Sequence, residues 1–133
     1  MRFLTPRGET PFSIPDEWWE FVVENDLPLN HPHFFLYDGE KFPDAEIVRL
    51  WDIEPPRKSP DVQEFLKHKL APVLVAFFSP EYSLGPVELT RLPRSQKSPY
   101  KYRLTRGFHR YYASVAIGYS MIPAIVRTEP RTP

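Results

Sequence analysis

Apolar side chains recur every three or four positions between residues 60 and 71, as on one face of a helix. Val62 and Leu66 illustrate this spacing. Pro72 follows, and it must end, kink or restart the helix because it lacks a backbone N–H. The apolar run VLVAFF comes next and fits either a short helix or a buried strand. We expect a helix there.

Two further elements are expected in the first 45 residues. Ser13 followed by Asp16 forms a capping box, which predicts a helix that runs to about residue 24. The segment HFFLYDGEKF carries Asp38-Gly39 between aromatic residues. Because this pair tolerates the positive φ angles of a two-residue turn, the segment predicts a tight hairpin.

Alternation of apolar and polar residues predicts strands over 45–53, 87–92, 100–106 and 122–126. Gly107 ends the third of these strands, and Gly118 ends a helix that lies between the two glycines. We therefore expect an α+β fold, with a mixed sheet and flanking helices. Its parts are a helix-plus-hairpin extension over residues 1–45, a core domain over 46–128 and a flexible tail over 129–133.

Composition removes several classes of function. The chain has 17 basic and 17 acidic residues, so its formal net charge gives no broad footprint for duplex nucleic acid. Without cysteine, disulfides, thiolate metal sites and cysteine nucleophiles are excluded. The first residues lack the apolar stretch of a signal peptide, and VLVAFF is too short to span a bilayer. We expect a cytoplasmic protein.

Charge is unusual around Gly107. Arg106, His109 and Arg110 surround what should be the first turn of a helix. This end already carries partial positive charge, so each cation should cost roughly 0.3–1 kcal/mol near the surface. Helix N-termini bind anions, and arginine offers a planar fork of donors that suits phosphate. The pattern indicates that an anion completes the site.

The same segment resembles the signature of the ParB/sulfiredoxin superfamily. A strand leads to Gly107-Phe108-His109-Arg110, then to a helix with Ala113 and Ala116, and then to Gly118 and the strand IPAIV. Upstream, VRLWDIEPPR looks like the family's opening strand and PVEL like the strand usually written P-I-x-V. The resemblance covers roughly residues 46–128 and leaves residues 1–45 outside it.

The resemblance implies that the glycine-led turn binds nucleotide phosphates. Gly107 would let the backbone approach them, and His109 and Arg110 would supply charged contacts. An arginine at the position of Arg57 is common in ParB-like domains and would add a contact. The expected phosphate site is Gly107, Phe108, His109, Arg110, Arg106 and Arg57. The implied ligand is a nucleoside triphosphate or diphosphate, CTP or ATP/ADP, and the presence of Mg²⁺ stays open.

Departures from the family pattern limit what carries over. Phe108 stands where sulfiredoxin needs a cysteine, so disulfide-exchange chemistry is excluded. ParB continues into an E-N-x-x-R segment and a helix-turn-helix domain that do not appear before Pro133, so we do not expect a partition clamp. No carboxylate matches that of the family's free serine kinases. Whether the protein is an enzyme, an NTP-dependent switch or a homodimer stays open.

Two other functions remain as alternatives. A ParB-like nuclease or DNA-binding protein would hold a backbone phosphate at the same turn. Acids such as Asp44, Glu46, Asp52 and Glu54 would then hold its metal. A partner-binding module would use the Trp18–Trp19 helix as an apolar anchor. The His31-Pro32-His33 pair has no third ligand in the sequence, so we expect no metal site there.

Overall fold

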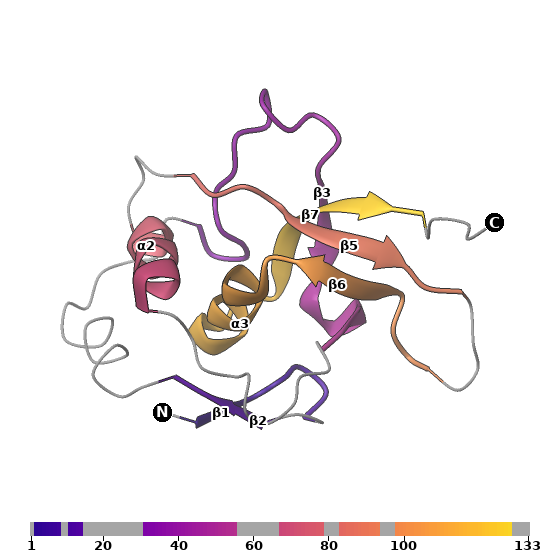
Figure 1. The fold of residues 1–133 in the computed structure, drawn as a ribbon, viewed down its shortest axis with the longest axis horizontal. Coiled ribbons are helices and arrows are strands. Elements are labelled where there is room, and N and C mark those ends of the chain that lie inside the picture. Colours follow the sequence, from indigo (N-terminus) through magenta and orange to yellow (C-terminus); the bar gives the residue numbers. More distant parts are fainter. Residues whose placement is uncertain are drawn as a thin grey trace.

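A computed structural model describes residues 2–8, 11–14, 31–55, 67–78, 83–93 and 98–128. Within them the chain forms a five-stranded mixed sheet, a separate two-stranded sheet and two α-helices (Figure 1). The expected α+β fold is confirmed. Most of the helix expected over residues 13–24, with Trp18 and Trp19, and the first half of the helix expected over 60–71 lie outside the described residues. Ser13 and Ile14 are described and are not helical.

The large sheet has the strand order β3-β7-β5-β6-β4. Its strands are β3 (Glu46–Arg49), β4 (Ile53–Glu54), β5 (Val87–Arg91), β6 (Tyr102–Arg106) and β7 (Met121–Arg127). At the centre, β5 runs antiparallel to β6 and parallel to β7. At the edges, β3 is antiparallel to β7 and β4 is parallel to β6. The strands expected over 87–92, 100–106 and 122–126 are confirmed.

The prediction of one continuous strand over 45–53 is wrong. The 3-10 turn η1 (Leu50–Asp52) divides it into β3 and β4, which lie at opposite edges of the sheet. In a flat sheet these edges would be about 19 Å apart, since neighbouring strands are about 4.8 Å apart. The short connection spans at most about 14 Å. The sheet therefore has to curl, so that one segment can pair at both edges.

The helix α2 (Lys67–Phe78) runs through Pro72, and VLVAFF is helical as expected. Pro72 is exposed, whereas Val73 and Phe77 are buried. The proline removes one helical hydrogen bond. Burial of the apolar side chains that follow offsets this loss, so the helix continues.

The helix α3 (Phe108–Ile117) contacts α2, β1 and β7 (Figure 1). It ends as expected at Gly118, whose φ is 94° and whose N–H donates to the carbonyl of Ser114. This left-handed cap turns the chain directly into β7. A strand–helix–strand unit at residues 102–127 thus holds the start of α3 beside the sheet.

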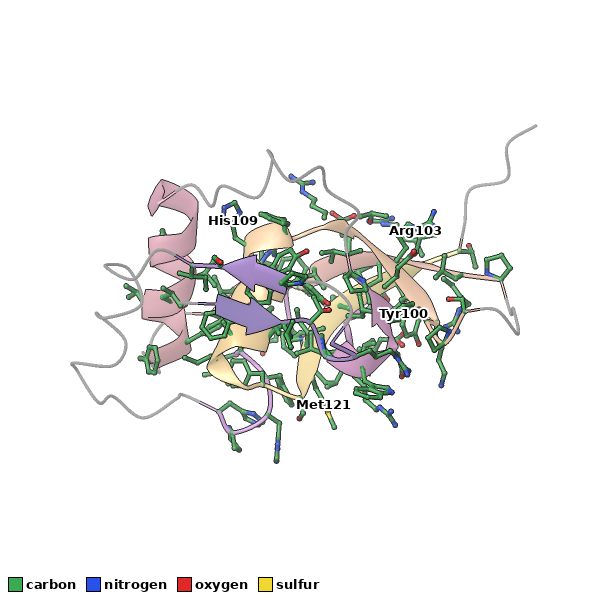
Figure 2. All side chains as sticks on the ribbon, turned by 90° about the horizontal axis from the view of Figure 1, so that it is seen from below. Tyr100, Arg103, His109 and Met121 are labelled. Atoms are coloured by element: carbon green, nitrogen blue, oxygen red, sulfur yellow. The ribbon has the colours of Figure 1, made fainter. Side chains whose placement is uncertain are left out.

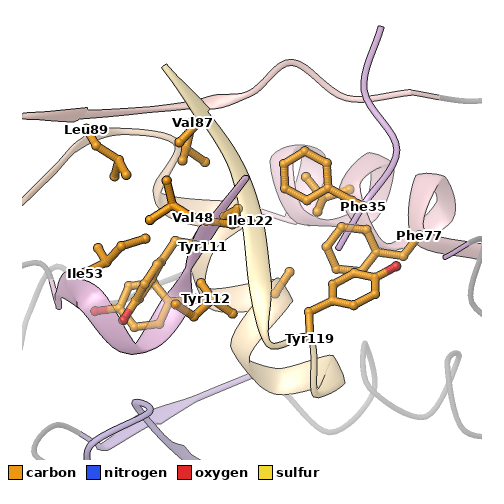
Figure 3. Close-up of a cluster of buried hydrophobic side chains, with 14 of the residues drawn as sticks. Phe35, Val48, Ile53, Phe77, Val87, Leu89, Tyr111, Tyr112, Tyr119 and Ile122 are labelled. Carbon is orange, nitrogen blue, oxygen red and sulfur yellow. The ribbon is translucent and has the colours of Figure 1, made fainter. Parts of the chain in front are cut away.

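Aromatic side chains fill the core on both sides of β7 (Figure 3). On one side the rings of Tyr111 and Tyr112 meet edge to face at 5.0 Å. On the other side Phe77 contacts Phe35 and Tyr119, with ring centroids 5.9 and 5.1 Å apart. Both tyrosines of α3 are buried in this core, where they cannot stack on the base of a ligand.

The N-terminal hairpin lies elsewhere than expected. Asp38 does form a turn, in which its Oδ1 accepts hydrogen bonds from the N–H groups of Glu40 and Lys41. No strands flank that turn in the described residues, so the hairpin expected there is wrong. Instead, β1 (Arg2–Leu4) pairs with β2 (Pro11–Ser13). Phe12 of β2 packs against Tyr112 of α3.

Arg7 joins the turn of this hairpin to η1 and to the segment that precedes β6. Its guanidinium lies 4.3 Å from the ring centroid of Trp51 and 5.3 Å from that of Tyr100. Its Nε donates to the carbonyl of Trp51 at 3.1 Å, and its Nη2 lies 3.5 Å from the carbonyl of Pro99. Stacking and hydrogen bonding by one side chain therefore connect three segments that are far apart in the sequence.

The substitution Arg7→Ala should lower the free energy of unfolding by about 1–2 kcal/mol, because it removes a cation–π contact and a charged hydrogen bond. Urea denaturation measures the change. Arg7→Lys keeps the charge but not the planar fork of donors. It should therefore retain less than half of the stability that the Arg7 side chain contributes. Equal stability of the wild type and Arg7→Ala would contradict this role for Arg7.

No helix in the described part of the chain is both long and apolar enough to cross a membrane.

Candidate anion site at the start of helix α3

Gly107 is required by the backbone at the start of α3. Its φ of 107° and ψ of 34° lie in a region that side chains disfavour. A Cβ built on Gly107 would lie 2.6 Å from Cγ1 and 2.9 Å from Cβ of Val87, closer than real Cβ atoms approach. The glycine thus allows the turn to pack directly on β5.

The first turn of α3 has polar groups but no negative charge of its own. No side chain caps Gly107 and no acid lies in the first turn, within the residues that the structure describes. The helical hydrogen bonds begin with the N–H of Tyr111, which donates to the carbonyl of Gly107 at 2.9 Å. The N–H groups of Phe108, His109 and Arg110 therefore precede the helical ladder, where the dipole favours an anion.

A β-bulge brings Arg106 beside Glu88. Leu104 pairs with Leu89 and Arg106 pairs with Glu88, so that Thr105 is an extra residue on β6. Strict alternation would place Arg106 on the same face as Leu104, which packs against the core. The bulge moves Arg106 to the face of Glu88, and Thr105 Oγ1 donates to the Glu88 carbonyl at 3.0 Å.

Glu88 is the acid at this site. Its Oε2 lies 3.6 Å from Nη1 of Arg106, and its Oε1 accepts a hydrogen bond from Nε of Arg127 at 3.2 Å. The Glu88 side chain is 25% exposed, whereas those of Arg106 and Arg127 are 78% and 63% exposed. One half-buried carboxylate thus pairs with two exposed cations at the surface.

Arg110 has a structural contact that the sequence does not reveal. Its Nη1 donates to the backbone carbonyls of Gly85 and Pro86, the second at 3.1 Å. Burial lowers the pKa of its guanidinium, and the charge of Arg106 lowers it further, while Glu88 opposes both effects. Arg110 therefore holds residues 85–86 against the turn, besides adding positive charge there.

The other expected site residues are placed differently. The ring of Phe108 packs edge to face on that of Tyr112, with centroids 4.7 Å apart. Phe108 would therefore contribute to the site through its backbone. His109 lies at the start of α3, partly exposed, and its ring contacts that of Phe108 (Figure 2). Arg57 lies outside the described residues. The structure brings together Arg106, Gly107, His109 and Arg110, and it adds Glu88 and Arg127.

Two of the acids and one of the histidines considered for a metal are engaged in other contacts. Asp52 lies in η1, 3.8 Å from Nε of Arg49 and 4.0 Å from Nζ of Lys101. Glu54 accepts a hydrogen bond from Nε of Arg103 at 3.1 Å. Nδ1 of His31 accepts one from the N–H of His33. Among the described residues, no three side chains that could bind a metal form a group.

Sequence analysis missed Glu88 and Arg127. The pattern around Glu88, with Val87 and Leu89 apolar, indicates only that its side chain points away from the core. Its partners come from β6 and β7, and only the strand order β7-β5-β6 brings them to either side of β5. No local pattern in the sequence predicts that strand order.

No family model, curated protein or solved structure shows a significant match to this chain.

Proposed function

We propose that the protein binds a nucleotide through its phosphates at the Gly107–Arg110 turn. One observation carries the proposal: α3 begins with a glycine that has no side-chain cap and packs on β5. The first turn of α3 carries His109 and Arg110 but no acid, and Arg106 precedes the glycine. Phosphate oxygens would accept hydrogen bonds from first-turn N–H groups. They would also offset the cost of the cations at this end of the helix.

Each side chain has a distinct part in this proposal. Arg106, at 78% exposure, is able to leave Glu88 and pair with a phosphate. His109 adds a ring nitrogen at the same turn. Arg110, held by the carbonyls of Gly85 and Pro86, contributes charge from a fixed position. Such a site serves an NTP-dependent switch as well as phosphoryl transfer, because both begin with binding of the phosphates.

The resemblance to the ParB/sulfiredoxin superfamily supports the same ligand. The quoted motif falls on the turn whose geometry suggests an anion, and CTP and ATP/ADP are the nucleotides that the family implies. Under this proposal the protein acts in the cytoplasm, where nucleoside triphosphates are abundant. The role of Mg²⁺ is part of the test, since nucleotide phosphates usually carry this ion.

Nucleic-acid binding is the second candidate, and a row of side chains on the sheet favours it. Arg103 of β6 and Arg127 of β7 both pair with Thr90 of β5, so they project on one face about 10 Å apart. Arg106 lies on the same face through the bulge. A backbone with regularly spaced phosphates could follow these arginines, although Glu54 and Glu88 partly neutralise them.

Thermal unfolding with CTP, ATP, ADP or GTP, each with and without Mg²⁺, tests the first candidate. A ligand at 100 times its dissociation constant stabilises the folded state by about 2.7 kcal/mol, which raises Tm by several degrees. Arg106→Ala should lose most of this shift. Arg103→Ala is the matched control, because Arg103 is also an exposed arginine of β6 paired with a glutamate. It should keep the shift.

Two results would decide against nucleotide binding at this turn. In one, no nucleotide raises Tm. In the other, Arg106→Ala and Arg103→Ala reduce the shift equally, which would indicate a general effect of charge. DNA affinity that falls steeply with salt, weakened by both substitutions, would support the nucleic-acid candidate instead.

A further inference from the structure

Two guanidinium groups pair with one carboxylate beside the start of α3, and a third lies near enough to be affected by its charge. Glu88 pairs with Arg106 and Arg127, and its charge also acts on Arg110. Three positive charges thus face one negative charge from a single side chain. The backbone of Glu88 is fixed, because Glu88 lies in the central strand β5 and its carbonyl accepts a hydrogen bond from the Thr105 hydroxyl. Arg106 and Arg127, in contrast, have long exposed side chains.

We propose that Glu88 is the internal counter-anion of this site, which a ligand phosphate replaces on binding. In the unliganded protein its carboxylate holds Arg106 and Arg127 close to β5. When a phosphate binds at the turn, Arg106 exchanges the Glu88 carboxylate for phosphate oxygens. This inference rests on the proposed function and adds to it a residue that sets the affinity of the site.

Physical chemistry gives the direction of the effect. An approaching phosphate must compete for Arg106 and is repelled by the Glu88 carboxylate, so both effects weaken binding. Repulsion grows with the charge of the ligand, so it is larger for a triphosphate than for a single phosphate. Glu88 therefore lowers the affinity for every phosphate, and it does so most for the most highly charged ones.

The substitution Glu88→Gln removes the charge and keeps the shape of the side chain. We expect it to bind inorganic tripolyphosphate about fivefold more tightly than the wild type, because two exposed ion pairs no longer compete. The gain for inorganic phosphate should be smaller. Isothermal titration calorimetry measures both affinities. Glu54→Gln is the matched control, since Glu54 pairs with Arg103 on another part of the same sheet, and it should leave both affinities unchanged.

A double-mutant cycle separates exchange from a general change of charge. If Arg106 moves from Glu88 to the ligand, Arg106→Ala should weaken tripolyphosphate binding more in the Glu88→Gln background than in the wild type. A purely long-range effect of Glu88 predicts the same loss in both backgrounds. Equal losses would overturn the exchange.

The outcomes distinguish this inference from the proposed function. If the wild type binds tripolyphosphate and Glu88→Gln binds no more tightly, the role of Glu88 is wrong and the site stands. If only Glu88→Gln binds, Glu88 acts as proposed but nucleotide binding by the wild type is wrong. If neither protein binds while both are folded, both proposals fail.

Discussion

Gly107→Ala should lower the free energy of unfolding by about 2–5 kcal/mol, from two independent causes. A left-handed conformation costs an L-residue about 1–2 kcal/mol, and Gly107 has a φ of 107°. The new methyl group would also lie 2.6 Å from Cγ1 of Val87, which is fully buried in β5. Overpacking of this kind costs about 1–3 kcal/mol. Urea denaturation measures the total.

Gly118→Ala is the matched control for this substitution. Gly118 also has a positive φ, 94°, but a Cβ built there meets no atom within 4 Å. It should therefore cost only the conformational part, about 1–2 kcal/mol. Val87→Ala tests the contact directly, because it removes both γ carbons. If contact with Val87 matters, Gly107→Ala and Val87→Ala together should cost less than the sum of the two single substitutions. Strict additivity would show that the turn tolerates the methyl group.

Local sequence signals predicted most elements of the sheet and α3. Gly107 and Gly118 define the ends of α3 because their backbone conformations exclude most other residues, and a sequence shows glycine directly. The break after Arg49 had no such signal. It arises because the curled sheet makes β3 and β4 pair at opposite edges, which depends on strand order. Pro72, a strong local signal for a helix end, was outweighed by burial of the residues that follow it.

The candidate site shows the same division. The charges of Arg106, His109 and Arg110 near a helix start were visible in the sequence, because they lie within a few residues of one another. Sequence could not show that a bulge at Thr105 turns Arg106 toward Glu88, or that Arg110 holds two carbonyls of another segment. Both features depend on contacts across strands. Local patterns therefore indicated the turn at which we propose an anion binds, and the tertiary structure added Glu88, the acid that we propose competes with it.

Three buried tyrosines should make the fold unusually sensitive to alkaline pH. Burial raises the pKa of Tyr112 and that of Tyr119 to about 12. The pKa of Tyr111 is raised further, first by burial and then by Tyr112 and Tyr100. Above about pH 10 the unfolded chain loses these phenolic protons while the folded protein keeps them. The stability that they contribute is complete below pH 10 and decreases as pH rises toward the folded-state values.

The expected loss is about 1.4 kcal/mol per pH unit for each tyrosine, or about 4 kcal/mol per pH unit for all three. Between pH 10 and the folded-state pKa values of about 12, the loss amounts to about 8 kcal/mol, which would unfold a domain in the lower half of the usual stability range of about 5–15 kcal/mol. Urea denaturation between about pH 8 and pH 11 measures the slope. The part of the tyrosinate absorbance that comes from the buried rings should appear together with loss of structure, since their ionisation requires exposure.

Tyr111→Phe is the sharpest test of this explanation. The Tyr111 hydroxyl is buried without a hydrogen-bond partner among the described residues, so its removal should maintain or increase stability at neutral pH. It should also reduce the alkaline slope by about one third, because one of three equal contributions disappears. Tyr119→Phe should reduce the slope similarly, because it also removes one of the three contributions. An unchanged slope in both variants would mean that other groups cause the alkaline unfolding.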